Sequence, residues 1–324
     1  MEIHSLQPNH RPQEKTDPIH SGGIIPKFRA SLLVASLGFA TLPAGAATMF
    51  TEFFSFGDSL TDSGNVALAV GPPYPSGRYS DGPTWAEYLS NDHLGLGPHE
   101  PSVAGGNNHA WGGARTGGGG LTPTVLQQVG GYLASEGTFQ STSLVSVWAG
   151  ANDFFDTATD PGGPVSPSVS VGNISAAIDL LAGAGVRYII IPNFPDFGAA
   201  PGLAGGPGSA GASAWVQGYN SLLSSELDAQ RTALGISIYE VDLYTLGADI
   251  GANPGKYGFT NGTDAVVPDF TLDPTLTAYW DGVHPTTATH AIFAQEAFNS
   301  IPEPSTGVLA IFAFGIACTR RTRR

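Results

Sequence analysis

The stretch FGDSLTDSGN, residues 56–65, continues the apolar run at 51–56 and places Ser59 directly after a predicted strand. α/β enzymes carry their chemistry where strands end, so this position is typical of a nucleophile. A serine there is also common as a turn residue or a helix N-cap. Three further motifs downstream favour the nucleophile.

These motifs are NHAWGGA at 108–114, GAND at 150–153 and DGVHPT at 281–286. Serine is a weak nucleophile until a base removes its proton, and a histidine is the natural base near neutral pH. His284 can accept the proton of Ser59, and Asp281, three residues earlier, can hold the imidazole in the required tautomer. The motifs therefore predict a catalytic set of Ser59, His284 and Asp281.

Acyl transfer also develops a negative oxygen that needs hydrogen-bond donors. Asn152 offers a side-chain amide, and Gly113 offers a backbone amide that a substrate can approach closely because glycine has no Cβ. With the amide of Ser59, these groups form the predicted oxyanion hole.

The acidic residues beside these groups are predicted to act on the loops and not on the substrate. We expect Asp58 and Asp153 to brace their loops through local hydrogen bonds, and Asp62 to do so at the start of the next helix. Arg115 is expected to be a surface or ion-pair residue, although binding of an anionic substrate stays open. The remaining histidines are His4, His10 and His20 in the leader, His93, His99 and His109 without a suitably spaced acid, and His290, which we expect to pack structurally.

From residue 53 to 298 the chain resembles the GDSL, or SGNH, esterase and lipase family. The resemblance rests on the four motifs above and extends to GRYSDGPTW at 77–85, PDFG at 195–198 and YNSLL at 219–223. It is greatest to the branch shared by plant GDSL lipases and bacterial secreted lipases and acyltransferases. It implies a three-layer αβα, flavodoxin-like fold with a parallel sheet, and ester hydrolysis through an acyl-enzyme.

The sequence pattern between the chain ends agrees with that fold. Short apolar runs predict strands at 51–56, 143–148, 186–191 and 236–241, and continuous apolar runs suit strands buried on both faces. Helical periodicity places three helix faces between or after them. These faces comprise Ile174, Ala177, Ile178 and Leu181; Tyr219, Leu222, Leu223 and Leu227; and Ile292, Phe293, Glu296 and Ala297. Glycine and proline between 160–164 and 201–211 predict surface loops, of which the second could also rim the substrate cleft.

The charge distribution limits the classes of molecule that the protein is expected to bind. Of 13 Lys and Arg residues, only five lie between residues 48 and 304, against 24 acidic residues, so this part carries a net charge near −19. Such a body is expected to repel nucleic acids and anionic membranes. The single cysteine, Cys318, excludes an intrachain disulfide. No phosphate-binding loop or metal-ligand pattern appears, so we expect no cofactor.

Both chain ends have the pattern of targeting signals. Residues 1–47 end in a basic flank, an apolar run at 30–42 and a small-residue stretch, which is the order of a secretory signal peptide. Residues 301–324 combine a Pro-Glu-Pro motif, a short apolar run and terminal arginines. This tail resembles the PEP-CTERM sorting signal of Gram-negative bacteria. The resemblance implies export to the periplasm, cell surface or extracellular matrix, an exosortase partner and transient membrane association.

The sequence therefore predicts a hydrolase domain at 48–300 that acts as a secreted serine esterase or lipase on an ester substrate. Three alternatives stay open: an exopolysaccharide O-acetyl esterase, an acyltransferase, and a non-catalytic envelope or matrix protein on the same fold. The acyl length, the alcohol part and the oligomeric state are not determined by these patterns.

Overall fold

The structure is a computed structural model that describes residues 50–67, 71–136, 139–156 and 163–302. All of these belong to one compact unit, Pro43–Arg324. The predicted leader, 1–47, lies outside the described residues, as does the predicted tail, 301–324, apart from its first two residues. Ile301 is buried in the core, so the folded part of the chain includes it.

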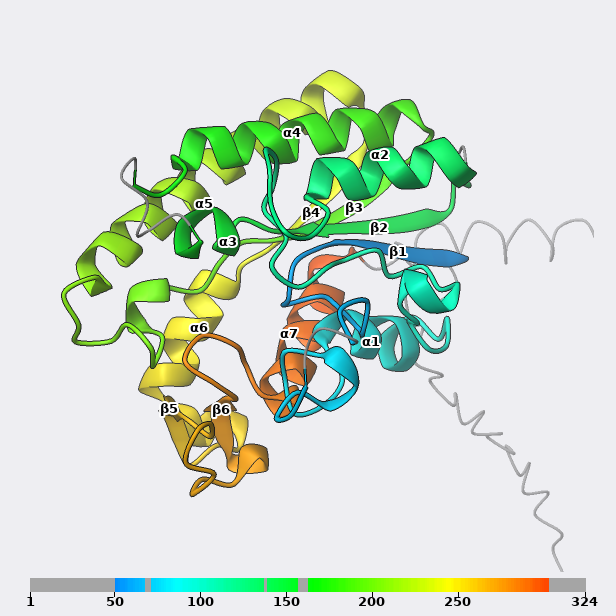
Figure 1. The fold of residues 1–324 in the computed structure, drawn as a ribbon. Helices are drawn as coiled ribbons and strands as arrows, with labels where there is room; N and C mark the ends of the chain where they lie inside the picture. Colours follow the sequence, from blue (N-terminus) through cyan, green and yellow to red (C-terminus); the bar gives the residue numbers. More distant parts are fainter. Residues whose placement is uncertain (1–49, 68–70, 137–138, 157–162, 303–324) are drawn as a thin grey trace, which may run out of the picture. The chain divides into compact units, whose positions relative to one another are not determined.

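A four-stranded parallel sheet forms the centre of the fold, in the order β1-β2-β3-β4 (Figure 1). The regular elements are β1 (Glu52–Gly57), α1 (Trp85–Tyr88), α2 (Val125–Glu136), β2 (Ser143–Trp148), α3 (Ala151–Phe155), α4 (Pro167–Gly183), β3 (Tyr188–Pro192), α5 (Ser209–Leu234), β4 (Ser237–Val241), α6 (Leu243–Ala252), β5 (Asn261–Ala265), β6 (Thr277–Tyr279) and α7 (Thr287–Ser300). All four predicted strands are confirmed to within two residues at each end. Every residue of β2 is buried, as expected for a strand covered on both faces.

A fifth segment, which the sequence analysis missed, extends the sheet beyond β1. The Ser55 amide donates to the Asn107 carbonyl at 3.1 Å, and the His109 amide donates back to the Ser55 carbonyl at 2.7 Å. The Trp111 amide then reaches the Gly57 carbonyl at 3.1 Å. This short segment lies parallel to β1 at the place of the outer strand in a flavodoxin-like sheet. The segment, Asn-Asn-His-Ala-Trp at 107–111, is mostly polar and has no apolar run, so periodicity could not reveal it.

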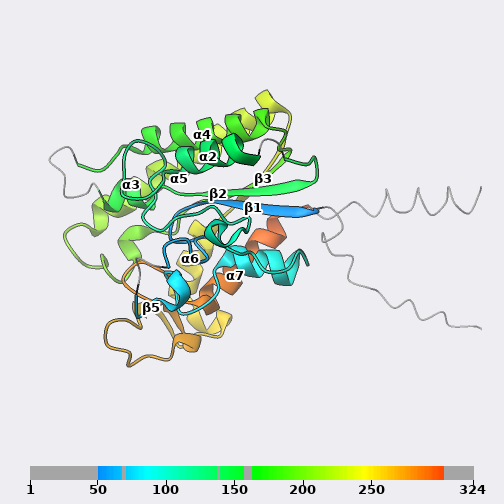
Figure 2. The same ribbon diagram turned by 45° about the vertical axis from the view of Figure 1, so that its right-hand side comes forward.

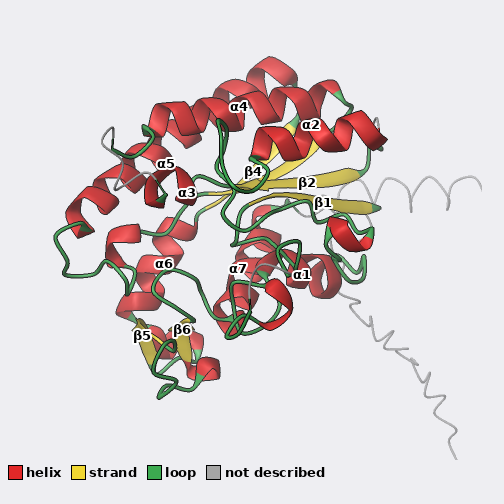
Figure 3. Cartoon of the chain, viewed as in Figure 1, coloured by secondary structure: helices red, strands yellow, loops and turns green. Residues whose placement is uncertain are grey.

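Helices cover both faces of the sheet. The views in Figure 1 and Figure 2 place α2, α4 and α5 on one face and α1 and α7 on the other. In Figure 3 the yellow strands of this four-stranded sheet lie between these two groups of red helices. The predicted three-layer αβα fold with a parallel sheet is therefore confirmed. The small pair of strands β5 and β6 lies apart from the main sheet, next to α6.

The predicted helix faces pack as expected, with one exception. All four apolar residues assigned to the face of α4 are buried. On α5, Tyr219, Leu223 and Leu227 are buried, but Leu222 is 44% exposed. The prediction for Leu222 was wrong, because its position on the helix falls just outside the stripe that meets the sheet and α4. On α7, Phe293 and Ala297 are buried, while Ile292 and Glu296 of the same predicted face are half-buried.

His290 on α7 has the structural role that we expected. It is fully buried, and its Nδ1 accepts a hydrogen bond of 3.2 Å from the Trp85 amide, which joins α7 to α1. Burial, together with the charge of His284, lowers the pKa of His290 to about 3. An unfolded histidine titrates near pH 6.5. Between these two values the unfolded chain binds a proton that the folded chain does not, so acidification favours unfolding.

We predict that His290→Asn weakens this pH dependence. The asparagine oxygen can replace Nδ1 as acceptor, but it does not titrate. The stability lost between pH 7 and pH 5 should be smaller in the variant than in the wild-type chain by about 2 kcal/mol. Urea unfolding at the two pH values measures this difference. Equal losses in the two proteins would contradict the account.

Candidate active site

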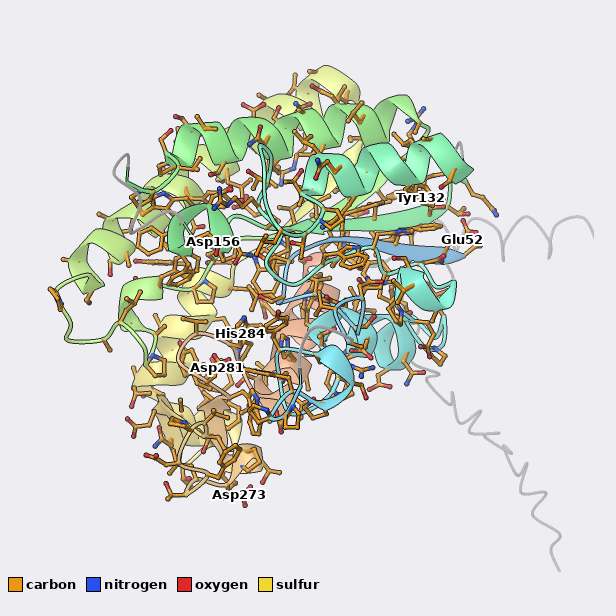
Figure 4. The ribbon with its side chains drawn as sticks, in the orientation of Figure 1. Glu52, Tyr132, Asp156, Asp273, Asp281 and His284 are labelled. Atoms are coloured by element: carbon orange, nitrogen blue, oxygen red, sulfur yellow. The ribbon has the colours of Figure 1, made fainter. Side chains whose placement is uncertain are left out.

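The predicted site residues meet at the carboxyl end of the sheet. Ser59 follows β1 by two residues, Gly113 follows the outer segment, and Asn152 lies in α3 just after β2. Asp281 and His284 lie in the loop between β6 and α7. Figure 4 shows these last two at one end of the sheet, away from Glu52 at the first residue of β1. The structure thus brings all five predicted residues to the same edge.

A continuous chain of hydrogen bonds joins the serine, the histidine and the aspartate. The Ser59 Oγ atom lies 2.9 Å from His284 Nε2, and His284 Nδ1 lies 2.8 Å from Asp281 Oδ2. Because an ionised carboxylate only accepts hydrogen bonds, Nδ1 carries the ring proton. Nε2 is then left as an acceptor that faces the serine hydroxyl.

Asp281 is held in its ionised form by several donors. Its Oδ1 accepts from the amides of Val283 at 2.9 Å and His284 at 2.8 Å. Its Oδ2 also accepts from the Tyr74 hydroxyl at 2.8 Å, a contact that the sequence analysis missed. Burial alone would raise the pKa of Asp281, but the hydrogen bond and charge of His284 and the two amides lower it to about 2. The carboxylate is therefore charged throughout the physiological pH range.

Asp58 braces the turn that presents Ser59, as predicted. It is fully buried, and its Oδ1 accepts from the Leu60 amide at 3.0 Å. Its backbone carbonyl accepts from the amides of Thr61 and Asp62, both at 3.0 Å. Burial raises the pKa of Asp58 to about 7, although the Leu60 amide opposes this shift.

Two backbone amides and one side-chain amide at this edge of the sheet have unused donors. Neither the Ser59 nor the Gly113 N–H makes a hydrogen bond to any residue that the structure describes. Gly113 has a φ of 78°, a left-handed conformation that glycine adopts without strain. Asn152 uses one of its two N–H groups to donate to the Ala114 carbonyl at 2.9 Å, which leaves the other available. The arrangement provides donors for an anionic oxygen.

Two aspartates outside this set fix the loop that carries Gly113. Asp62 accepts from the amides of Gly64 and Asn65 through Oδ1, at 2.8 and 2.6 Å, and from the Gly112 amide through Oδ2 at 2.8 Å. The expected helix after Asp62 is absent, because the chain from 58 to 67 forms turns. Instead, the carboxylate joins the nucleophile turn to the loop of Gly113.

The other aspartate, Asp153, lies in α3 beside Asn152 and ties the same loop to that helix. Its carboxylate accepts from the hydroxyl of Thr116 at 2.5 Å and from the Thr116 amide at 3.3 Å. The predicted bracing role of Asp153 is confirmed. Nearby, Arg115 forms an ion pair with Asp156 at 3.5 Å, as expected for a surface residue.

The other described histidines lie away from this chemistry. His99 is buried and bonded to the Ser55 hydroxyl at 2.8 Å, and burial lowers its pKa to about 3. His109 stacks on Phe56, and burial lowers its pKa to about 4. Among the described residues, no group of three or more His, Cys, Asp or Glu side chains could hold a metal ion. Within the same residues, none of the helices has the length and hydrophobicity needed to cross a membrane.

Chain neighbours of Ser59 and His284 line an apolar pocket, although neither of these two residues lines it. Leu60 follows the serine, and Val283 and Pro285 flank the histidine; all three contribute to its lining. The loop after β3 supplies a further wall with Phe194 and Phe197. The loop at 201–208 reaches the same region, because the Gly202 amide donates to the Gly282 carbonyl at 2.8 Å. It thus contacts the histidine loop, and its expected role at the rim of the substrate cleft stays a prediction.

Comparison with known proteins finds related sequences over most of the chain. Residues 53–297 match the family model of the GDSL-like Lipase/Acylhydrolase. The chain is 27% identical to the esterase EstA of Pseudomonas aeruginosa over 85% of its own length and 50% of the relative. It is 25% identical to a phosphatidylcholine-sterol acyltransferase of Aeromonas hydrophila, over 83% of this chain and 96% of that protein. It thus spans about half the length of the EstA relative and nearly all of the acyltransferase.

Solved structures with a similar arrangement include two from bacteria. A putative GDSL-like lipase from Parabacteroides merdae has a TM-score of 0.48 at 12% identity, over 78% of this chain and 95% of that one. An acetylxylan esterase from Geobacillus stearothermophilus has a TM-score of 0.43 at 17% identity, over 77% and 93%.

The family model covers most of the chain, and the chain belongs to the GDSL-like lipase/acylhydrolase family. The class of enzyme that this family defines is an ester-bond hydrolase.

We predict that Asp62→Asn lowers kcat more than it changes KM. An amide in this position must turn an N–H group toward the amide of Gly112 or of Gly64 and Asn65, so the loop carrying Gly113 shifts. Loss of one oxyanion donor costs roughly a hundredfold in kcat, and partial misplacement should cost on the order of tenfold, with KM within about threefold.

The matched control is Asp242→Asn, which changes a helix cap at α6. It should lower the melting temperature without lowering kcat. Equal loss of kcat in the two variants would show that Asp62 acts only through general stability.

Proposed function

We propose that this protein is a serine esterase or lipase that hydrolyses carboxylic esters through an acyl-enzyme intermediate. The observation that carries the proposal is the hydrogen-bonded series Ser59–His284–Asp281 beside the unpaired amides of Ser59 and Gly113. A nucleophile, its base, the group that orients the base and an anion site occur together. A structural role for these groups would leave the unpaired amides without an explanation.

In the first half of the reaction, the Ser59 oxygen attacks the carbonyl carbon of the ester. His284 Nε2 takes the hydroxyl proton as the bond forms, and Asp281 stabilises the resulting imidazolium through Nδ1–H. The carbonyl oxygen becomes negative and accepts hydrogen bonds from Ser59, Gly113 and Asn152. The intermediate collapses when the alcohol leaves with the proton from His284, and the acyl group stays on Ser59.

In the second half, water replaces the alcohol and the same groups act in the same order. His284 takes a proton from water, the hydroxide attacks the acyl carbon, and the proton returns to Ser59 as the acid leaves. If another alcohol enters in place of water, these steps give acyl transfer. The name of the Aeromonas relative describes that reaction, so acyl transfer is the second candidate.

We assign the acyl group to the apolar pocket that is lined by chain neighbours of Ser59 and His284. Its walls include Leu60, Val283 and the aromatic rings of Phe194, Phe197 and Phe293. Apolar surface of this kind favours a hydrocarbon chain over a charged group, because a charge would lose its hydration there. The acidic body of the protein likewise favours neutral esters.

We predict that Ser59→Ala and His284→Ala each lower kcat for p-nitrophenyl butyrate by at least a thousandfold. The double variant should be hardly slower than either single one, because groups that act as a unit are strongly non-additive. Ser63→Ala is the matched control, since the Ser63 hydroxyl is buried four residues away and makes no hydrogen bond to the described residues. Substantial turnover by Ser59→Ala would assign the nucleophile to another residue.

We further propose that the protein is exported and sorted through its two ends. The support is the sequence pattern alone: the signal-peptide order within residues 1–47 and the Pro-Glu-Pro, apolar and arginine parts of 301–324. An exosortase-type enzyme would process the tail after transient association with the membrane. The protein would then act in the periplasm, on the cell surface or in the extracellular matrix.

Mass spectrometry of the protein recovered from its native cells tests this proposal. We expect the mature chain to begin near Ala47 and to lack the residues that follow the Pro302 to Pro304 motif. A freely soluble extracellular protein that still ends at Arg324 would contradict tail processing, while the esterase proposal would stand.

A further inference from the structure

Tyr79 lies between the histidine and the loop of the anion site. Its ring centre is 5.1 Å from that of His284, at an interplanar angle of 36°. On its other side the ring covers Gly112, since a Cβ built on that glycine would lie 2.2 Å from Cε2 of Tyr79 and 3.0 Å from its hydroxyl. A side chain at position 112 would therefore displace the ring. Tyr79 forms a wall of the site immediately beside Gly113.

The backbone on both sides of Tyr79 is firmly anchored. Arg78 forms a bidentate ion pair with Glu87, at 2.9 and 2.6 Å. The Ser80 hydroxyl donates to the Pro285 carbonyl at 3.0 Å, next to His284. One residue further, Asp81 accepts from the amide of Thr287 at the start of α7, at 2.7 Å. These contacts bind the segment to α1 and to the histidine loop, so the ring is held in place before any substrate arrives.

Tyr74 completes the placement of the ring. It packs against Tyr79 with ring centres 5.4 Å apart, while its hydroxyl is used by Asp281. The Tyr79 hydroxyl, by contrast, makes no hydrogen bond to any described residue, and it is not among the fully buried polar atoms without a partner. Burial and the charges of Asp62 and Asp281 raise the pKa of Tyr79, so the hydroxyl keeps its proton and remains a donor.

We propose that Tyr79 binds the alcohol part of the ester and that its hydroxyl donates a hydrogen bond to an oxygen of a neutral alcohol carrying further hydroxyl groups, such as glycerol or a sugar. The proposal rests on the proposed esterase function. The alcohol leaves with the proton of His284, whose ring Tyr79 contacts. The acyl pocket is lined by other residues, and Tyr79 is not one of them.

The chemistry of the surroundings sets the class of alcohol. A tyrosine offers an apolar face and one donor, which suits a compact, neutral group with oxygen acceptors. The carboxylates of Asp62 and Asp281 lie close enough to influence Tyr79, and they would repel an alcohol part that carries a phosphate or carboxylate. A simple alkyl alcohol would leave the hydroxyl of Tyr79 without an acceptor.

The test compares three butyrate esters that share an acyl group: ethyl butyrate, glycerol monobutyrate and the 6-butyrate of methyl glucoside. A neutral hydrogen bond is worth roughly two- to tenfold in kcat/KM. Tyr79→Phe keeps the ring and its packing. We expect it to lower kcat/KM for the glycerol or the sugar ester by that factor, and to leave ethyl butyrate within about twofold. The ester with the larger loss identifies the alcohol.

Two further variants distinguish a failure of the Tyr79 proposal from a failure of the proposed esterase function. Tyr188→Phe makes the same change at the opposite, amino end of β3 and should leave all three values unchanged. Ser59→Ala should hydrolyse none of the esters. An equal effect of Tyr79→Phe on all three esters, or no effect on any, would overturn the role of Tyr79. Hydrolysis by Ser59→Ala, or by no version of the protein, would instead overturn the proposed function.

Discussion

The hydrogen bond between Ser59 and His284 joins residues that are 225 positions apart in the chain. It forms only if the turn after β1 and the loop before α7 arrive at the same edge of the sheet with the correct orientation. The parallel sheet makes this possible, because the carboxyl ends of all its strands lie on one side. The large buried core around β2 and β3 therefore has a direct chemical consequence: it fixes the separation of the two reacting groups.

The same edge keeps its hydrogen-bond donors unused. Buried amides are nearly always paired, and an unpaired one is costly. Around Ser59, three carboxylates pair with neighbouring loops: Asp58 with Leu60, Asp62 with Gly112, and Asp153 with Thr116. These contacts fix the two loops, while the amides of Ser59 and Gly113 make no hydrogen bond to any described residue. By fixing these loops, the carboxylates keep the amide donors in place before the reaction begins. Such preorganised donors are the source of much of an enzyme's rate enhancement.

The sequence was sufficient for the fold class, the four main strands and the residues that meet at the site, because each depends on a local pattern: an apolar run or a short motif. It was insufficient where the determining contact lies far along the chain. The outer segment at 107–111 has no apolar period and depends on β1 for its hydrogen bonds. Asp62 was expected at a helix start, yet its partner Gly112 lies 50 positions away.

Tyr74 and Tyr79 illustrate the same limit at the site itself. Only Tyr79 lies in a stretch noted for its family resemblance, 77–85, and no spacing rule relates a tyrosine at 74 to an aspartate at 281. Their positions follow from ion pairs and hydrogen bonds with α1 and α7, which only the folded chain brings together. The proposed catalytic residues were therefore easier to predict from the sequence than the residues that hold them in position.

The central claim is that Ser59 is the nucleophile and that His284 activates it. Reaction with diethyl p-nitrophenyl phosphate tests this directly, since the activated oxygen displaces p-nitrophenol and keeps the diethylphosphoryl group. Mass spectrometry of the labelled protein should find one such group per chain, on the peptide that contains Ser59, and none in Ser59→Ala or His284→Ala. A label on another residue, or undiminished labelling of the His284→Ala protein, would contradict the account.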